Sequence, residues 1–198
     1  MFIFKNDSKA KPFIRLKKEY KRAIAAKQFL PEAICISSYL SLTKEVNSRY
    51  VNLKFIDNES FIFFSNYNSP KAIDFSSHTQ ISAVLFWSSI NVQIRMKAKI
   101  KKTSKSFNQK YFSIRSKEKN ALAISSNQSK SIESYSQIIE NYNASFKNDN
   151  LKKCPKYWGG FSFIPYEIEF WEGNEFRINK RSLYKKNKNS WDQFILEP

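Results

Sequence analysis

One stretch constrains the fold more than any other, because residues 92–100 alternate strictly between apolar and polar side chains. Val, Ile, Met, Ala and Ile alternate there with Gln, Arg, Lys and Lys. Since neighbouring side chains of an extended strand point to opposite faces, such a strand has one buried face and one wet face. Strands of this kind are typical of antiparallel sheets, so the sequence predicts an antiparallel β-protein.

Four other β-rich runs precede this strand and are separated by polar segments. They cover residues 33–40, 49–55, 60–65 and 80–87. The turn Asp57-Asn58-Glu59 separates the second run from the third and indicates a β-hairpin. Short strands at this spacing are typical of an antiparallel barrel or sandwich.

The amino-terminal region follows a helical period instead. Between residues 11 and 29, apolar side chains recur at intervals of three and four residues, at Phe13, Leu16, Tyr20 and Ile24. This spacing predicts an amphipathic helix with a basic outer face within an amino-terminal segment, residues 1–30. We expect the helix to pack across one end of the sheet.

The middle of the chain, residues 104–147, is predicted to be a helical insertion. Residues 104–114 and 132–146 carry helical periodicity. The apolar face of the second helix consists of Ile132, Tyr135, Ile138, Ile139 and Tyr142. Between the two helices, residues 120–130 are rich in small polar side chains and indicate a loop or a frayed helix end. A polar linker, residues 147–156, leads to strands that resume at Tyr157.

The length and composition predict one domain. A chain of 198 residues with 41% hydrophobic side chains can fill a single core, so residues 1–198 are expected to fold together.

The longest apolar stretches, such as Ile81–Trp87, are far shorter than the roughly 20 residues that cross a bilayer. The amino terminus lacks the pattern of a signal peptide, so we expect a cytoplasmic protein. Cys35 and Cys154 lack metal-ligand spacing, and we expect free thiols and no metal site.

The formal charge of +17 raises the question of an anionic partner such as nucleic acid. Lysine supplies 27 of the 34 basic residues and is spread through the chain, with short clusters only at 97–105 and 180–188. No recognition-helix, zinc-finger or RNA-binding motif accompanies them. We therefore interpret the charge as a compositional bias. The seven arginines are more informative, because a chain that uses lysine by default needs arginine where a flat, bidentate cation is required.

The carboxy-terminal strands, residues 157–198, contain all three glycines of the chain, at Gly159, Gly160 and Gly173. In so glycine-poor a sequence, this placement indicates backbone conformations or close approaches that a side chain would block. Ordinary hairpin turns are the alternative interpretation.

The same segment carries an aromatic residue and two cations at fixed spacing. Trp171, Arg177 and Arg181 follow the pattern W-x5-R-x3-R. On extended strands the two arginines are an even number of residues apart, which predicts that they point to the same face. They would then line one pocket with the indole, suited to a flat, electron-rich ring that carries a phosphate.

These residues resemble the carboxy-terminal signature of the pyridoxamine 5′-phosphate oxidase family. The signature consists here of WGGF, a proline and IEFW-x-G, then R-x3-R-x2-Y, and a final tryptophan with a terminal L-x-P. No common fold feature demands this set, so the match is specific. Further segments from about Leu16 onward are similar to family motifs: RYVNLK (49–54), FFSNYNSPKA (63–72), VQIR (92–95), KYFSIR (110–115) and NQS (127–129).

The resemblance implies an FMN-binding split β-barrel, antiparallel and Greek-key-like, with peripheral helices. It also implies a homodimer with FMN at the subunit interface. By position, the FMN contacts would be Arg49, Lys54, Phe64, Ser65, Lys71, Gln93, Gln128, Ser129, Trp171 and Arg181, several of them from the second subunit. Arginine and lysine can bind the phosphate, while glutamine amides can reach the flavin edge.

A substrate site is implied as well. Lys54, Tyr111 and Arg115 would hold the substrate phosphate, and Arg177, the candidate catalytic residue, would lie against the pyridine ring. The implied reaction is hydride transfer from C4′ of pyridoxine or pyridoxamine 5′-phosphate to the flavin. Dioxygen then reoxidises the flavin, and hydrogen peroxide and pyridoxal 5′-phosphate are released. The cofactor carries the redox step, and the protein supplies orientation and electrostatics.

The sequence departs from the family pattern at several places. Pro70 replaces an arginine, and Lys119 replaces a serine among the substrate contacts. Asn179 replaces the histidine of an R-x-H motif and can form hydrogen bonds but cannot titrate. Residues 44–47 replace a Gly-x-Pro turn. The FMN site is therefore better preserved than the substrate site, in which Lys119 and Asn179 remain candidate contacts.

Three functions follow from these residues. The first is oxidation of pyridoxamine or pyridoxine 5′-phosphate. The second is a related FMN oxidase or reductase that acts on another small heterocyclic substrate, which the changes at Lys119 and Asn179 favour. The third is a flavin-binding or pyridoxal-phosphate-binding protein without turnover, or a basic surface for nucleic acid. Fold alone cannot choose among them, because function depends on the site.

Overall fold

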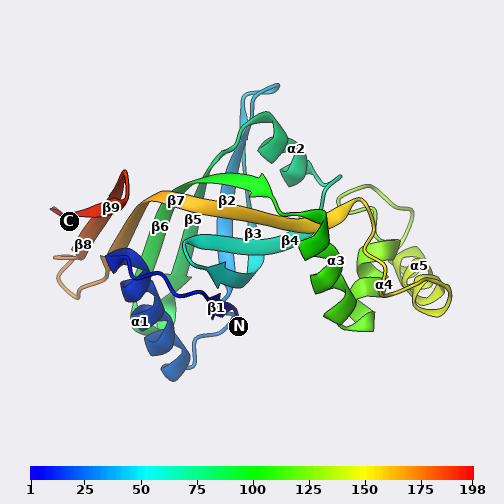
Figure 1. Cartoon of the computed structure of the whole chain (residues 1–198), viewed down its shortest axis with the longest axis horizontal. Helices are drawn as coiled ribbons and strands as arrows, with labels where there is room; N and C mark the ends of the chain where they lie inside the picture. Colours follow the sequence, from blue (N-terminus) through cyan, green and yellow to red (C-terminus); the bar gives the residue numbers. More distant parts are fainter.

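All five predicted β-runs form strands, in one nine-stranded sheet of the computed structural model, which describes residues 1–198 (Figure 1). The strands are β1 (Ile3–Lys5), β2 (Ala33–Leu40), β3 (Glu45–Asp57), β4 (Ser60–Asn66), β5 (Gln80–Trp87), β6 (Val92–Lys102), β7 (Trp158–Glu172), β8 (Lys180–Asn187) and β9 (Ser190–Leu196). The helices are α1 (Lys11–Ala25), α2 (Pro70–Ser77), α3 (Lys105–Ile114), α4 (Lys117–Ser125) and α5 (Tyr135–Asn148), with a 3-10 turn, η1, at Ser88–Ile90. The prediction of a mainly β fold with peripheral helices is confirmed.

Six of the strands close into a ring. Around this ring β3 pairs with β2, β2 with β5, β5 with β6, β6 with β7, β7 with β4, and β4 again with β3. These pairings are all antiparallel, and the one parallel pair joins the short β1 to β3. Because a closed ring has no free edge, the fold is a barrel and not a sandwich. The hairpin β8–β9 lies outside the ring and extends from β7.

The longest strand, β7, belongs to both parts of the sheet. It pairs with β4 as far as Phe163 and with β8 from Glu167 onward. Pro165 lies where the partner changes and where the register with β6 shifts, as expected for a residue without an N–H to donate. In Figure 1, β7 crosses the molecule, with α3, α4 and α5 at one end and the β8–β9 hairpin at the other.

The alternation in β6 places its apolar side chains inside the barrel. Ile94 and Met96 are at most 2% exposed, whereas the side chain of Lys97 on the other face is 59% exposed. Phenylalanines of β4 and β7 fill the space opposite, and the rings of Phe61 and Phe163 stack with their centroids 5.0 Å apart. Burial of one such side chain contributes about 1.5–3 kcal/mol, so these rings are a main source of barrel stability.

The predicted amino-terminal helix is α1, and it packs on the barrel through its apolar stripe. Phe13 and Leu16 are almost fully buried, and the ring of Tyr20 lies 5.8 Å from that of Trp87. The ring of Phe13 also lies 5.9 Å from that of Trp191 in β9. The helix thus contacts both β5 in the barrel and β9 in the carboxy-terminal hairpin. The short β1 has no counterpart among the predicted strands, because three residues are too few to form a pattern.

The other helices differ in part from the predictions. Pro70 begins α2, where its missing N–H removes no helical hydrogen bond. Helix α4 continues to Ser125, so the predicted loop at 120–130 begins only at Ser126. Helix α5 begins at Tyr135 because the hydroxyl of Ser134 accepts a hydrogen bond from the N–H of Gln137 and caps the first turn.

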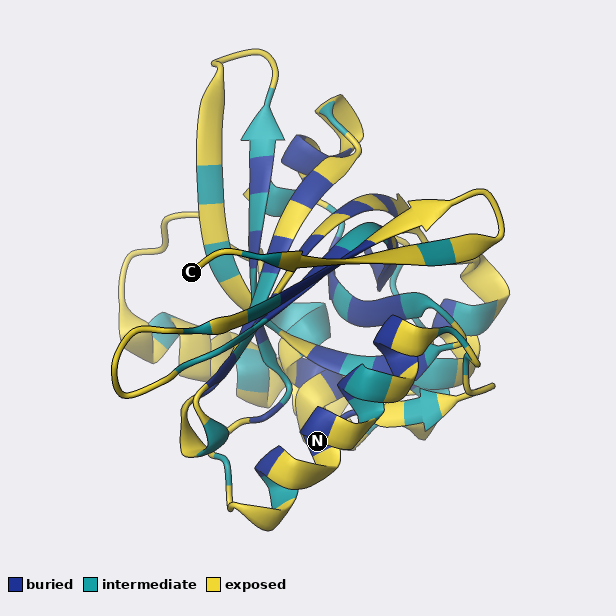
Figure 2. Cartoon of the chain, turned by 90° about the vertical axis from the view of Figure 1, so that its left-hand side faces the viewer, coloured by how far each residue is buried: buried dark blue, intermediate teal, exposed yellow.

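The apolar face of α5 is less buried than its periodicity predicts. Tyr135 is 76% exposed and Ile139 is 47% exposed. The helix packs on α4 at the edge of the molecule, away from the barrel (Figure 1). Figure 2 shows the same contrast across the protein, with buried strands at the centre and exposed hairpins and outer helices. No helix combines the length and the apolar composition needed to cross a bilayer.

Candidate functional site

The first group of predicted site residues surrounds the start of α2. The ammonium of Lys71 lies 3.2 Å from the hydroxyl of Ser65, 3.2 Å from that of Ser69 and 3.4 Å from the amide oxygen of Gln128. Burial and the nearby charge of Arg49 lower the pKa of Lys71. A half-buried ammonium in contact with neutral oxygens alone favours an anion as a further partner.

Arg49 lies beside Lys71 and is held in place by a buried acid. One guanidinium nitrogen lies 2.9 Å from the carboxylate of Asp74, which is 1% exposed. Another nitrogen donates to the hydroxyl of Ser38, which in turn donates to Asp74 at 2.6 Å. Asp74 therefore fixes the guanidinium next to Lys71, while part of the Arg49 side chain stays exposed.

A stack of aromatic rings lies next to these cations. The ring of Phe64 is 4.0 Å from that of Tyr111 and 5.1 Å from that of Trp158, and both pairs are nearly parallel. The edge of Phe55 meets the Tyr111 ring at 5.4 Å. Burial raises the pKa of the Tyr111 phenol. Parallel rings of this kind provide a flat surface against which another planar ring can pack.

Lys54 owes its orientation to a β-bulge. The register between β3 and β4 shifts between Leu53 and Phe55, so Lys54 is the extra residue and leaves the ladder. Burial and the charges of Lys119 and Arg115 lower the pKa of Lys54, although Glu32 acts in the opposite direction. Three cations therefore converge here, and their mutual repulsion also favours an anionic ligand.

Arg115, just after α3, is fixed by a buried asparagine. Its guanidinium donates to the amide oxygen of Asn120 at 3.1 Å and lies 4.8 Å above the ring of Trp158. Asn120 is 1% exposed, and its amide nitrogen donates to the carbonyls of Phe112 and Leu151 at 2.8 and 2.7 Å. The side chain of Asn120 thus ties the end of α3, the linker before β7 and Arg115 together.

A cavity of about 230 Å³ connects the two cationic groups. Its lining contains five predicted site residues, Phe64, Ser65, Arg115, Lys119 and Gln128, together with Asn66, Leu122, Ala123, Ser126 and Trp158. Pockets for small ligands usually measure about 300–1,000 Å³, so this cavity alone is smaller than a typical ligand site.

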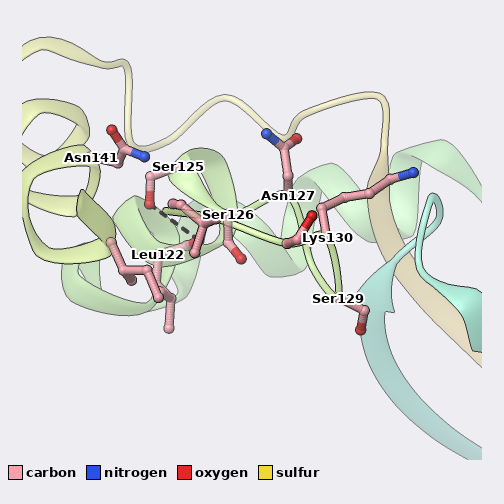
Figure 3. A pocket seen from close by; sticks show the side chains of 10 residues that line it. Leu122, Ser125, Ser126, Asn127, Ser129, Lys130 and Asn141 are labelled. Carbon is pink, nitrogen blue, oxygen red and sulfur yellow. Dashed lines mark hydrogen bonds between the residues drawn. The ribbon is translucent and has the colours of Figure 1, made fainter. Parts of the chain in front are cut away.

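A neighbouring cavity of about 280 Å³ adjoins the first along the loop after α4 (Figure 3). Its lining consists of Leu122, Ser125, Ser126, Asn127, Ser129, Lys130, Ser131, Ile132, Ile138 and Asn141. Of the predicted site residues it contains only Ser129, whose φ of 68° places it in a tight turn. Lys130 is its one cation. The convergence of charged and aromatic groups therefore favours the smaller cavity as the functional one.

Gly159 and Gly160 allow α3 to approach β7 closely. A Cβ on Gly159 would overlap the Tyr67 hydroxyl and the Asn108 amide, and one on Gly160 would overlap the hydroxyl of Thr103. No glycine has a positive φ, so close approach explains their placement. The amide of Asn108 donates to the Tyr67 hydroxyl and accepts from the N–H of Gly160, both at 2.9 Å. This network holds the helix that leads to two predicted substrate contacts.

The second group of predicted residues lies at the other end of β7. Gln93, Trp171 and Arg181 stand directly opposite one another on β6, β7 and β8, and all three are half-buried. The Nε of Arg181 lies 2.9 Å from the carboxylate of Glu169. An amide, an indole and a guanidinium thus form one continuous surface on the polar face of the sheet.

The prediction that Arg177 and Arg181 share a strand face is wrong. Arg177 is exposed in the loop between β7 and β8, and its φ of 60° is far from extended, so strand alternation does not apply. The amide oxygen of Asn179 accepts a hydrogen bond from the N–H of Asn174 at 3.0 Å and helps to close the same loop. The loop, and not the strand, therefore presents Arg177 and Asn179.

The two groups of predicted residues cannot meet within one chain. Gly159 pairs with Ser65 in the first group, and Trp171 pairs with Arg181 in the second. At about 3.3 Å per residue, the strand between residues 159 and 171 spans about 40 Å. Figure 1 shows the corresponding ends of β7 on opposite sides of the molecule. A single small ligand cannot touch both groups unless a second chain supplies one of them.

Several residues that build these groups are absent from the predicted set. They are Trp158, Asp74, Asn120 and Glu169. Two of them left a usable signal, because Glu169 is an acid flanked by the apolar residues Ile168 and Phe170, and Trp158 directly precedes the glycine pair. Asn120 left none, since asparagine is common throughout the chain.

Comparison with known proteins adds to this geometry. Residues 158–198 match the family described as pyridoxine 5′-phosphate oxidase C-terminal dimerisation region. The chain is 34% identical over 191 residues to a pyridoxine/pyridoxamine 5′-phosphate oxidase of Nostoc sp., a match that covers 94% of this chain and 88% of that relative.

Two solved structures have a similar fold. PhzG from Burkholderia lata, in complex with tetrahydrophenazine-1-carboxylic acid, matches with a TM-score of 0.89 and 23% identity, over 96% of this chain and 93% of that one. A pyridoxamine 5′-phosphate oxidase-related, FMN-binding protein from Nostoc punctiforme matches with a TM-score of 0.75 and 10% identity, over 92% of this chain and 96% of that one.

Proposed function

The chain belongs to the pyridoxine/pyridoxamine 5′-phosphate oxidase family, and we propose that it binds FMN and oxidises pyridoxamine or pyridoxine 5′-phosphate with dioxygen. The observation that carries the proposal is the cavity at which predicted cofactor contacts and predicted substrate contacts meet. FMN, when bound, would supply the redox chemistry, and the chain would supply binding, orientation and charge. We also propose that residues 1–198 act as one domain, since one sheet takes strands from both ends of the chain.

The group around Lys71 fits the phosphate of FMN. Lys71 and Arg49 are two cations on neighbouring elements, and Ser65 offers a hydroxyl 3.2 Å from the Lys71 ammonium. Charge-assisted hydrogen bonds to phosphate are among the strong ones, and arginine can form two of them at once. Gln128 reaches the same group from the loop after α4 and offers an amide to the polar edge of the ring system.

The group around Lys54 fits the phosphate of the substrate. The ring of Tyr111 stacks on Phe64, which lines the cavity. Lys119 and Arg115 line the same cavity, and Lys54 lies close enough for both charges to lower its pKa. An anion placed among them relieves their repulsion, and the aromatic stack lies close enough to pack against the ring of the same molecule. Lys119 would act as a point charge where the family pattern has a hydroxyl.

Two chains would share each site. The first group of residues would come from one subunit, and Gln93, Trp171 and Arg181 from its partner. The match of residues 158–198 to a dimerisation region supports this arrangement. So does the exposure of large apolar side chains in and near the carboxy-terminal hairpin, at Phe176 and Ile195, which are 77% and 76% exposed. Burial of such side chains between subunits is favourable by about 25 cal/mol per Å².

Substrate orientation would be the main contribution of the chain to the reaction. The net reaction moves two electrons from the substrate carbon to dioxygen. It gives pyridoxal 5′-phosphate and hydrogen peroxide, and with the amine substrate it also consumes water and releases ammonia. Asn179 cannot accept or release a proton at neutral pH, and its amide oxygen already accepts a hydrogen bond from the N–H of Asn174 in the loop. Arg177 from the same loop would lie against the substrate ring. We therefore expect a slower enzyme than one with a titratable group at position 179, but an active one.

One observation favours a second candidate, a related FMN oxidase or reductase that acts on another small heterocyclic molecule. Asn179 and Lys119 are the substrate-side positions that depart from the family pattern. PhzG, which shares the fold, was crystallised with a phenazine derivative and not with a vitamin phosphate. A flavin-binding protein without turnover is the remaining alternative.

The proposed function is tested by loading the protein with FMN and adding pyridoxamine or pyridoxine 5′-phosphate without oxygen. We expect the visible flavin absorbance to bleach, to return when air is admitted, and to leave pyridoxal 5′-phosphate in solution. A flavin that stays yellow with both substrates would refute the oxidase proposal and direct the search to other heterocycles. A protein that takes up no FMN would refute the flavoenzyme proposal as a whole.

Subunit complementation tests the shared site. Lys71→Met and Arg181→Gln each impair one half of the site, so each homodimer should bind FMN weakly at both sites. A heterodimer isolated with two different tags has one site with both residues intact, and it should bind about one FMN per dimer where wild type binds two. Absence of any recovery would show that both residues act within one chain, or that one of them does not act at all.

A further inference from the structure

Glu169 is a buried acid on a polar surface. It lies in β7 on the same face as Trp171, but it is only 6% exposed. Arg181 donates to one carboxylate oxygen through Nε at 2.9 Å, and Arg95 donates to the other. Burial alone would raise the pKa of Glu169, but the hydrogen bonds and charges of the two arginines hold it below its ordinary value. The carboxylate is therefore charged at neutral pH and bridges β6 and β8.

Two residues away, Glu167 provides the contrasting case. It lies on the same face of β7 and pairs with Lys97 at 3.0 Å. Its side chain is 21% exposed and that of Lys97 is 59% exposed, so this is a solvated pair between strands. Exposed pairs of this kind contribute little to stability or to side-chain order. Glu167 thus carries the same charge on the same strand as Glu169, but it is less buried and pairs with one lysine where Glu169 pairs with two arginines.

Only one of the three guanidinium nitrogens of Arg181 remains available to donate to a ligand. Nε is bound to the carboxylate, and Nη1 donates to the backbone oxygen of Glu197 at 2.8 Å. Nη2 has no hydrogen bond within the chain. A side chain held at two of its three nitrogens is ordered before a ligand arrives, and this reduces the entropy lost on binding. The free nitrogen is therefore presented on the surface that includes Trp171.

We infer that Glu169 is a positioning residue, which holds Arg181 in the conformation that binds the cofactor beside Trp171. The inference rests on the proposed function, in which Arg181 contacts FMN. Glu169 itself would not touch the ligand. Its role depends on a negative charge, which orders the guanidinium of Arg181 and neutralises the charge of Arg95. Nη2 of Arg181 then stays available to donate to an anionic or carbonyl group.

The test compares FMN affinity across four variants by quenching of flavin fluorescence. Glu169→Gln should weaken FMN binding about tenfold, because the lost hydrogen bond is one between charged groups. Glu167→Gln, the matched control, should stay within about twofold of wild type, as expected for an exposed pair. Arg181→Gln should also weaken binding. The double variant should bind FMN less than about twofold more weakly than Arg181→Gln alone. A residue that acts through Arg181 has no effect on affinity once Arg181 is replaced.

The outcomes separate the inference from a general structural role. Additive losses in the double variant would overturn the inference, because a purely structural effect of Glu169 would persist without Arg181. Equal FMN affinity in wild type and Glu169→Gln would also overturn it. If Glu169→Gln does not fold, Glu169→Asp keeps the charge but draws it back from Arg181, and it should bind FMN more weakly than wild type; unchanged affinity refutes the inference. A wild-type protein that binds no FMN refutes the proposed function, and the inference with it.

Discussion

Gly159→Ala should destabilise the protein much more than Gly173→Ala. At Gly159 the new methyl group would overlap the Tyr67 hydroxyl and the Asn108 amide. These groups are joined by a 2.9 Å hydrogen bond, and Asn108 is 4% exposed, so neither can move without loss. At Gly173 the overlap is with the side chain of Asn91, which is exposed and able to rotate away. The same chemical change therefore meets a rigid neighbour in one case and a mobile one in the other.

The magnitudes follow from the contacts. Overpacking of a well-packed site costs about 1–3 kcal/mol. Disruption of the Asn108 hydrogen bonds to Tyr67 and to the N–H of Gly160 costs about 1 kcal/mol for each bond. We therefore expect Gly159→Ala to lower the free energy of unfolding by about 3–5 kcal/mol, or the Tm by roughly 6–20 °C for a chain of this size. Gly173→Ala should change it by less than about 0.5 kcal/mol, because the lost unfolded-state entropy of glycine offsets the small rearrangement.

Urea unfolding followed by tryptophan fluorescence measures both variants. Protein concentration must be equal in all samples, because the stability of an assembling protein depends on it. Equal destabilisation by the two substitutions would refute the reasoning, since it would mean that the rigidity of the neighbour does not matter. A Gly159→Ala protein as stable as wild type would refute the close approach of α3 to β7.

Three further predictions concern the site. Lys71→Met should weaken FMN binding about tenfold or more in fluorescence titrations while leaving the unfolding midpoint of the apoprotein unchanged or higher, because burial already disfavours the charged amine. Asn120→Ala should lower stability by about 2–3 kcal/mol, since three hydrogen bonds are lost, and should raise KM for the phosphorylated substrate more than it lowers kcat, because Arg115 loses its support. The folded pKa of Glu169 lies below the ordinary value of 4.5, so its ion pairs stabilise the fold fully above that pH and are lost as the pH falls through the folded pKa. The difference in Tm between wild type and Glu169→Gln should therefore be constant in neutral buffers and disappear in strongly acidic ones.

Much of the candidate site could be predicted because its residues belong to contiguous motifs. Ser65 and Lys71 lie within one ten-residue segment, and the structure brings them within 3.2 Å of each other. The supporting residues could not be predicted in this way. Asp74 and Asn120 act through contacts with segments 25 and 31 residues distant, and no local pattern distinguishes a polar side chain that will be buried by a remote segment from one that stays in water.

The placement of Arg177 shows the limit of strand periodicity. The even spacing of Arg177 and Arg181 predicts a common face only if the chain between them is extended. The chain turns at Arg177 instead, where φ is 60°. This turn depends on the hydrogen bonds that close the loop, including the one from the N–H of Asn174 to the side-chain oxygen of Asn179. The alternation of side chains along a strand cannot predict where that strand begins. The loop before it is closed by hydrogen bonds that the alternating pattern does not contain.

By itself, the sequence determined the class of fold, the order of most strands and helices, and the family. It could do so because alternation, helical spacing and signature motifs are local properties of the chain. Only the tertiary structure decided that six strands close into a ring, that Lys54 leaves its strand at a bulge, and that the predicted site residues form two groups at opposite ends of β7. Strand pairing joins segments far apart in the chain, and it is this pairing that separates Trp171 from Lys71. Under the proposed function, a second chain would complete each group.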